Sequence, residues 1–179
     1  MQKNAVRNAV ENVATVGRAV AALLLLSLSA ATIGAAVGGA AGKLLQFIPL
    51  WAGVLALTRI EGRYLESVGL TRTRWAGGLL LFGLLPGGLI RLVQAGAEEL
   101  LYRGYILNRV NERYGRLWGI LISSGLFTLM HAMNPGFGLT DALQCILFSI
   151  LTGIYVFERG EIWGVMALHT IWNIRIDLL

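Results

Sequence analysis

Long stretches without a charged residue constrain this chain more than any other feature of its sequence. The first covers residues 19–42, and its 24 residues exceed the roughly 20 that an α-helix needs to cross a bilayer. Further uncharged stretches cover residues 44–58, 75–90, 117–140, 142–157 and 162–174. The charged residues fall in short clusters between them, as in the loops of helical membrane proteins. The sequence therefore predicts an all-α, polytopic membrane helix bundle.

Composition excludes the other broad classes of protein. Hydrophobic residues make up 56% and charged residues 14% of the 179 residues, against roughly 45–50% and 25% in average soluble domains. A soluble protein of this length exposes a large share of its surface, so it could not bury this many apolar residues. A disordered chain contains few apolar residues. The single cysteine, Cys145, allows no internal disulfide. The net charge of +5 comes without any groove-reading motif, so we expect no nucleic-acid partner.

We expect seven helices, with the active site buried inside their bundle. They are predicted at residues 14–42, 44–60, 75–93, 96–113, 117–133, 141–158 and 162–177. Residues 1–179 then form a single integral membrane domain, in which residues 1–64 are an N-terminal two-helix portion.

Basic residues orient this predicted bundle. With the N-terminus inside, the inner segments hold Lys3, Arg7, Arg18, Arg59, Arg63, Arg72, Arg74, Arg109, Arg113, Arg116 and Arg159, and the outer ends hold Lys43, Arg91 and Arg175. This distribution follows the positive-inside rule. It predicts a multi-pass protein of a prokaryotic plasma membrane with a cytoplasmic N-terminus.

Two adjacent acids, Glu98 and Glu99, interrupt an otherwise apolar region, and Arg103 follows them. On a helix, Glu99 and Arg103 are i,i+4 neighbours and can form an ion pair. Glu98 is rotated from Glu99 by about 100°, so it can face a cavity while Glu99 is neutralised. The alternative is structural, because acids are also favoured in the first turn of a helix.

The only two histidines of the chain, His131 and His169, also lie in apolar helices, and Asn173 shares a helix face with His169. In the seven-helix arrangement Glu98 begins the fourth helix at its outer end. A rise of 1.5 Å per residue places His131 about 21 Å, His169 about 10 Å and Asn173 about 16 Å along their helices from the inner ends. All four side chains then lie between the middle and the outer half of the bilayer. Ionisable groups at that depth are functional candidates.

These side chains suit peptide hydrolysis. A carboxylate and an imidazole can hold a water molecule whose proton the carboxylate accepts, and a second imidazole with an amide can stabilise an oxyanion. Zinc is the alternative, because Glu98, His131 and His169 form an acceptable ligand set with an open fourth position. The residues alone leave both mechanisms open.

Three motifs follow one another along the predicted helices: E-E-x-x-x-R from Glu98 to Arg103, F-x-x-x-H from Phe127 to His131 and H-x-x-x-N from His169 to Asn173. In this order they resemble the motifs of the CPBP family (CAAX protease and bacteriocin-processing, or Abi) of intramembrane proteases. The resemblance covers a core of residues 65–179.

The resemblance implies an intramembrane endopeptidase that cleaves a membrane protein or a lipid-anchored peptide within the lipid bilayer, as CAAX prenyl proteases do. By analogy Glu98 and His131 activate the water, His169 and Asn173 stabilise the oxyanion, and Glu99 with Arg103 supports the site. The glutamate-based mechanism needs no cofactor. The alternatives are an inactive membrane scaffold or bacteriocin-immunity protein on the same fold, and a small transporter.

Overall fold

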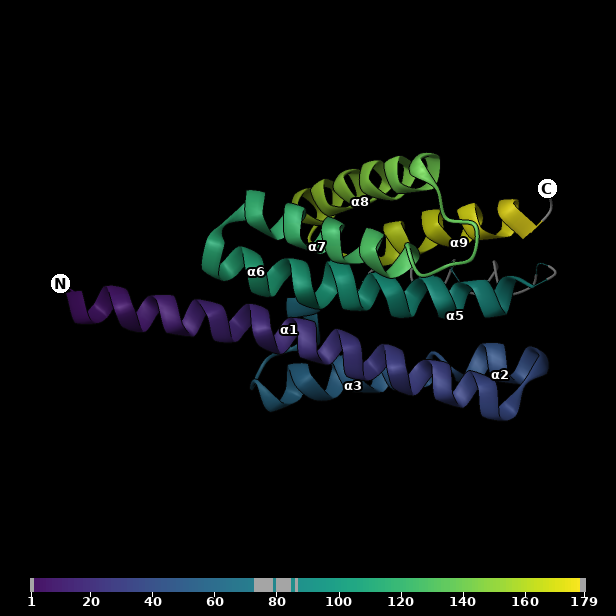
Figure 1. Cartoon of the computed structure of the whole chain (residues 1–179), viewed down its shortest axis with the longest axis horizontal. Coiled ribbons are helices and arrows are strands. Elements are labelled where there is room, and N and C mark those ends of the chain that lie inside the picture. The colour runs from purple at the N-terminus through teal and green to yellow at the C-terminus, as the bar shows by residue number, and fades with distance from the viewer. Residues whose placement is uncertain (1, 73–78, 80–84, 86, 178–179) are drawn as a thin grey trace.

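The computed structural model describes residues 2–72, 79, 85 and 87–177 (Figure 1). Its elements are α1 (Gln2–Val37), α2 (Gly39–Leu45), α3 (Ile48–Ile60), the 3-10 helix η1 (Leu65–Val68), α5 (Gly88–Glu99), the π-helix η3 (Leu100–Ile106), α6 (Leu107–Tyr114), α7 (Arg116–His131), α8 (Leu139–Arg159) and α9 (Trp163–Asp177). No strand occurs in these residues. The prediction of an all-α helix bundle is confirmed.

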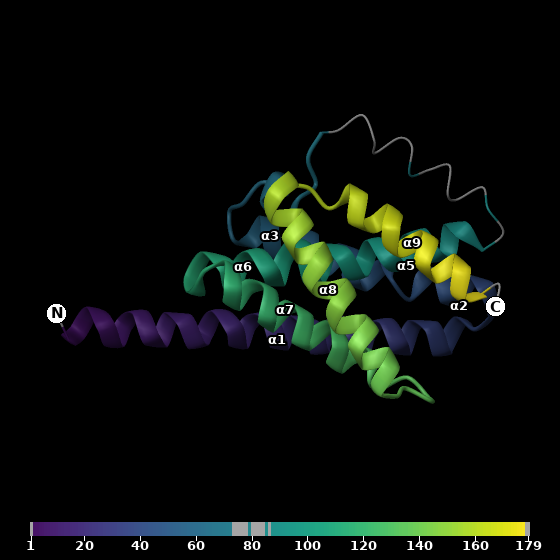
Figure 2. The same cartoon turned by 90° about the horizontal axis from the view of Figure 1, so that it is seen from above.

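The helices form two layers. Helices α1, α2 and α3 make one layer, and α5 to α9 make the other, with α5 and α6 facing the first layer (Figure 1). Helix α7 packs between α6 and α8, and α9 packs along α5. Seen from above, α8 crosses α7 at a steep angle (Figure 2). The turns of α5 and η3 are thereby enclosed by α3, α7, α8 and α9.

The prediction of seven helices is wrong in two places. The helices predicted at residues 14–42 and 44–60 are three helices, α1, α2 and α3, which are separated at Gly38 and at residues 46–47. Helix α5, which starts at Gly88 within the helix predicted at residues 75–93, continues without a break into the helix predicted at 96–113. The prediction placed a break where the sequence becomes more polar. Neither Gln94 nor Ala95 is a residue that ends a helix, so the helix continues through this region. Residues 75–78, 80–84 and 86 of that prediction lie outside the described residues. Glu98 consequently lies inside a long helix instead of at its outer end.

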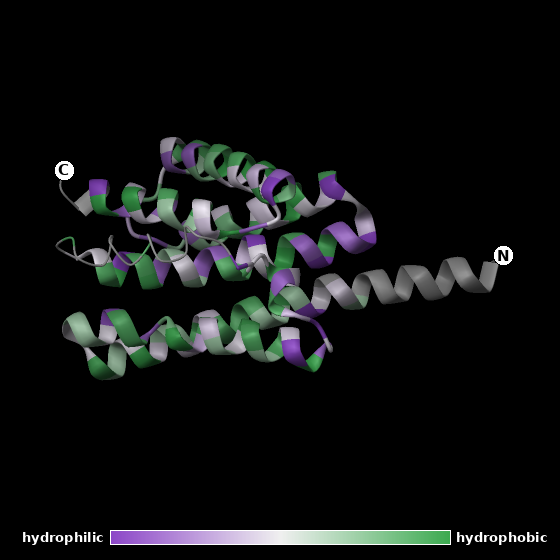
Figure 3. Cartoon of the chain, turned by 180° about the vertical axis from the view of Figure 1, so that it is seen from behind, coloured by the Kyte–Doolittle hydropathy of each residue, from purple (hydrophilic) through white to green (hydrophobic). Residues whose placement is uncertain are grey.

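Among the residues that the structure describes, three segments are long and apolar enough to cross a membrane: residues 17–37, 39–60 and 139–159. Helix α8 exposes one stripe of large apolar side chains, Leu143, Leu147, Leu151 and Ile154. Hydrophobic residues dominate most helices in Figure 3, and hydrophilic residues are densest on α6. An exposed apolar stripe on a long helix is suited to contact with lipid.

The π-helix η3 forms the centre of the core. All of its residues are buried, because it is surrounded by helices of both layers. A π-helix leaves its carbonyl groups imperfectly paired, and side chains supply the missing donors. The Asn108 amide donates to the carbonyl oxygens of Arg103 and Gly104, at 3.1 and 2.8 Å, and the Ser123 hydroxyl donates to that of Tyr102 at 2.9 Å. These donors explain how the irregular turn is retained in a dry interior.

Candidate active site

Glu98 places one carboxylate oxygen in a hydrogen bond and leaves the other facing two imidazoles. Its Oε1 accepts a hydrogen bond of 3.0 Å from the Gln94 amide, one turn earlier on α5. Its Oε2 lies 3.7 Å from Nε2 of His169 and 3.9 Å from Nε2 of His131. This oxygen is buried and has no hydrogen-bond partner. A buried, unpaired carboxylate oxygen is costly for the fold, which marks it as a functional candidate.

Glu99 points in a different direction from Glu98, as the helix rotation predicted. Its Oε2 lies 3.2 Å from Nε of Arg103, and both side chains are fully buried. The predicted i,i+4 ion pair is therefore confirmed. Its Oε1 lies 2.7 Å from Nδ1 of His169. Glu99 thus holds the imidazole ring of His169 in the orientation that turns Nε2 toward Glu98.

Arg103 is anchored by helix α8, which lies far away in the sequence. Its Nε donates to the Thr152 hydroxyl at 3.1 Å and its Nη2 donates to the Ser149 hydroxyl at 2.8 Å. The guanidinium also lies 4.3 Å from the centre of the Phe127 ring, a cation–π arrangement. These contacts compensate the burial of the charge together with Glu99.

His131 is held by the backbone of its own helix. Its Nδ1 lies 2.9 Å from the carbonyl oxygen of Phe127, and this oxygen can only accept. Nδ1 therefore carries a proton, and in the neutral ring Nε2 is an acceptor. The same holds for neutral His169, whose Nδ1 donates to Glu99. Three acceptor atoms then face one another, Glu98 Oε2 and the two Nε2 atoms, and a water molecule beside them can donate to two of the three.

Asn173 lies in the same cavity as both histidines. The cavity has a volume of about 280 Å³ and is lined by residues of α7, α8, α9 and the loop before α8, among them Phe127, His131, Phe148, His169, Trp172 and Asn173. The Nδ2 atom of Asn173 is buried and has no hydrogen-bond partner. An amide donor without a partner beside a pair of imidazoles can bind a developing oxyanion.

The zinc alternative can be compared with the spacing of the three acceptor atoms. In a tetrahedral site with bonds of about 2.0–2.1 Å, ligand atoms lie about 3.3 Å apart, which is shorter than the 3.7 and 3.9 Å separations here. In the described part of the chain, no group of three or more His, Cys, Asp or Glu side chains is arranged to hold a metal ion.

The sequence interpretation missed three residues of this site: Gln94, Ser149 and Thr152. Gln94 precedes Glu98 by one helical turn, so the i,i+4 spacing was a usable signal. Ser149 and Thr152 are small polar residues three positions apart on α8. Their spacing indicated a shared polar face, but nothing in the sequence indicated that Arg103 would contact it.

The fold and the site together define a helical membrane protein that encloses a carboxylate and two imidazoles within its bundle. The family model described as Type II CAAX prenyl endopeptidase Rce1-like matches residues 75–175. This match covers more than half of the chain and includes every candidate site residue. The chain belongs to this family of membrane proteases, which confirms the resemblance found in the sequence. No curated protein matches the chain, and no solved structure matches it.

Proposed function

We propose that the chain is an intramembrane endopeptidase in which Glu98 is the general base. The observation that carries this proposal is the unpaired Oε2 of Glu98, which faces the Nε2 atoms of His131 and His169. A water molecule at this point donates one hydrogen to Glu98 and the other to neutral His131. Glu98 takes the proton as the water oxygen attacks the carbonyl carbon of a peptide bond.

The oxyanion that forms is stabilised by two donors, His169 and Asn173. Asn173 donates through its unpartnered Nδ2. His169 donates through Nε2 when both ring nitrogens carry protons, and its Nδ1 then donates to the Glu99 carboxylate. Glu98 then gives its proton to the leaving amine, so the base ends the cycle ready for another water.

The substrate is a membrane protein or a lipid-anchored peptide. The cavity that holds His131, His169 and Asn173 has four aromatic side chains in its wall: Phe127, Phe137, Phe148 and Trp172. These rings favour an apolar peptide segment around the scissile bond. The family description, which names a CAAX prenyl endopeptidase, supports a lipid-modified substrate.

Substitution of Glu98 by glutamine tests the general base. Glutamine keeps the shape and the contact with Gln94 but cannot accept the proton. We expect cleavage of a prenylated CAAX peptide in proteoliposomes to fall by roughly 10²–10⁴-fold. The matched control is Glu158→Gln, which changes an exposed acid on α8 that pairs with Arg116. Retention of more than about a tenth of the rate in Glu98→Gln, or an equal loss in Glu158→Gln, contradicts the assignment. A protein that binds the peptide without cleaving it is instead the inactive scaffold considered above.

Elemental analysis tests whether the mechanism needs zinc. We propose a metal-free reaction, because the three acceptor atoms are spaced more widely than zinc ligands. Purified wild type then carries no stoichiometric zinc, and strong chelators leave the rate unchanged. One zinc per chain in the wild type and none in His169→Ala refutes the metal-free mechanism.

The orientation of the chain is a further part of the proposal. Arg18 begins the first span, Arg59 ends the second, and Arg109 and Arg113 lie at the end of α6, so these basic residues meet at one end of the bundle (Figure 1). We assign this end to the cytoplasmic side of a prokaryotic plasma membrane. Arg63→Cys on this end, combined with Cys145→Ser so that it is the sole thiol, should react with a membrane-impermeant thiol reagent only in inverted vesicles.

A further inference from the structure

A second cavity lies between the two layers, away from the active site. It has a volume of about 830 Å³ and is lined by α1, α3, η3 and α6 and by the residues after α3. It shares no lining residue with the cavity of His131 and His169. Nothing in the proposed hydrolysis uses it.

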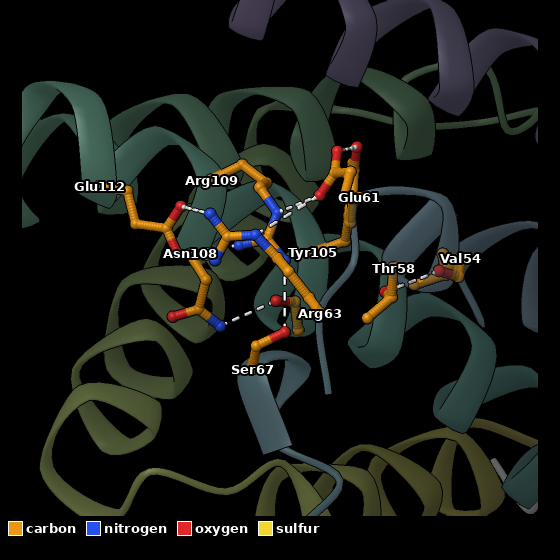
Figure 4. A network of polar contacts seen from close by, with 10 residues as sticks. Val54, Thr58, Glu61, Arg63, Ser67, Tyr105, Asn108, Arg109 and Glu112 are labelled. Atoms are coloured by element: carbon orange, nitrogen blue, oxygen red, sulfur yellow. Dashed lines mark hydrogen bonds and ion pairs between the residues drawn. The ribbon is translucent and has the colours of Figure 1, made fainter. Parts of the chain in front are cut away.

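One end of this cavity is a dense polar network (Figure 4). Glu61 accepts hydrogen bonds from Nε of Arg109 at 2.8 Å and from the Tyr105 hydroxyl at 2.7 Å. Glu112 accepts from both terminal nitrogens of Arg63, at 2.7 and 2.6 Å, and from Nη1 of Arg109 at 2.9 Å. Both carboxylates of the cavity are therefore already occupied by arginine.

Positive charge exceeds negative charge at this end. The lining contains four arginines, Arg18, Arg63, Arg109 and Arg113, and two acids, Glu61 and Glu112. Arg18 is exposed and, within the described part of the chain, makes no hydrogen bond or ion pair. An excess of arginine over carboxylate in a cavity attracts an anion, and the arginine fork suits phosphate oxygens.

The other end of the cavity is apolar. Its walls are Ala21, Ala22, Leu25 and Leu26 of α1 and Gly53, Ala56, Leu57 and Ile60 of α3. Arg18 begins the span 17–37, and Arg63 follows the end of the span 39–60. The basic end of the cavity therefore lies at the level of the membrane surface. From Arg18 to Leu26 the apolar part runs about 12 Å toward the middle of the spans, at 1.5 Å per residue.

We propose that this cavity binds an anionic glycerophospholipid, with its phosphate at the exposed Arg18, in the positive field of the other three arginines, and one acyl chain between α1 and α3. A basic end at the membrane surface and an apolar channel directed inward match the two parts of one lipid molecule. A free phosphate would use only the basic end, and a zwitterionic lipid would gain less from the excess positive charge.

Native mass spectrometry of the full chain, released from detergent micelles, tests this proposal with two defined lipids. Wild type should retain dioleoylphosphatidylglycerol several-fold more than dioleoylphosphatidylcholine. Arg18→Gln should remove this preference, since it takes away the exposed cation. Ala56→Phe should reduce retention of both lipids, since the ring fills the apolar end. The matched control is Arg59→Gln on α3, which removes an exposed cation that does not line the cavity and should behave like wild type.

Each contrary outcome overturns a stated part of the proposal. Equal retention of the two lipids by wild type, or an unchanged preference in Arg18→Gln, refutes the proposal that the cavity recognises an anionic headgroup. Unchanged retention in Ala56→Phe refutes the proposal that an acyl chain lies between α1 and α3. Displacement of phosphatidylglycerol by millimolar inorganic phosphate makes the cavity a free-phosphate site. Both substituted side chains are exposed, so the variants should fold, and a wild-type melting temperature checks this.

Discussion

Substitution of Glu99 by alanine should destabilise the fold and slow the reaction at the same time. The carboxylate is fully buried and serves two partners, Arg103 at 3.2 Å and His169 at 2.7 Å. Its removal leaves the Arg103 charge in a dry core with only the Ser149 and Thr152 hydroxyls and aromatic rings as partners. It also frees the imidazole of His169, which we propose donates to the oxyanion.

The size of the structural effect follows from the burial of the pair. Removing one member of a buried ion pair costs roughly 3–5 kcal/mol, because the remaining charge stays desolvated. For a domain of this length each kcal/mol lowers the melting temperature by about 2–4 °C, so we expect a decrease of about 6–20 °C in Glu99→Ala. Arg103→Ala should lose a similar amount, since it leaves Glu99 unpaired.

A double variant separates stability from activity. Replacing a buried pair by apolar residues of similar volume is often neutral or stabilising, so Glu99→Leu combined with Arg103→Met should melt near wild type. It should nevertheless cleave peptide slowly, because His169 has lost its acceptor at Nδ1. Melting is followed by circular dichroism in detergent and activity by peptide cleavage. If both single variants melt within about 2 °C of wild type, the ion pair of Glu99 and Arg103 does not stabilise the fold. Full activity in the double variant would show that Glu99 does not orient His169.

Three further substitutions address single contacts. Gln94→Leu removes the donor to Glu98 Oε1 and should lower kcat with KM little changed, because the carboxylate is no longer held toward the two histidines. An unchanged kcat contradicts the role of Gln94 in positioning the base. Asn173→Ala should lower kcat by roughly 10²–10³-fold with KM little changed, and a rise in KM alone would indicate substrate binding instead. Gly104→Ala should lower the melting temperature, because its Cβ would lie 2.6 Å from the Val68 carbonyl oxygen; an unaltered melting temperature would mean that η1 moves freely.

Local spacing carried most of what the sequence could predict about the site. The pair of Glu99 and Arg103 follows from helical periodicity, because both residues lie on one helix. The different directions of Glu98 and Glu99 follow from the rotation of about 100° per residue. His169 and Asn173 were expected to share one face, and both line the cavity. Such inferences depend only on regular helix geometry.

Contacts between helices could not be predicted from the sequence. The hydroxyls that bind Arg103 lie 46 and 49 positions away from it, on α8. This contact depends on the angle at which α8 crosses the bundle. Side-chain packing sets that angle, and the spacing of residues in the sequence does not reveal it. The continuity of α5 with α6 was missed for a related reason. A helical segment that contains charged residues looks like a loop in the sequence, because the partners that neutralise the charges are not known.

The π-helix η3 fixes the rotational phase between the two halves of one long helix. Glu98 precedes η3 and faces the histidines, whereas Arg109 follows it and faces Glu61 on the other side of the layer boundary. Inserting one further residue between Leu100 and Ile106, a segment that already holds the extra residue of a π-turn, would turn everything downstream by about 100°. The arginine network would then lose its alignment with α3 while Glu98 stayed in place. Chain length within this short segment is therefore a constraint as strict as the identity of the site residues, although its individual side chains touch no substrate.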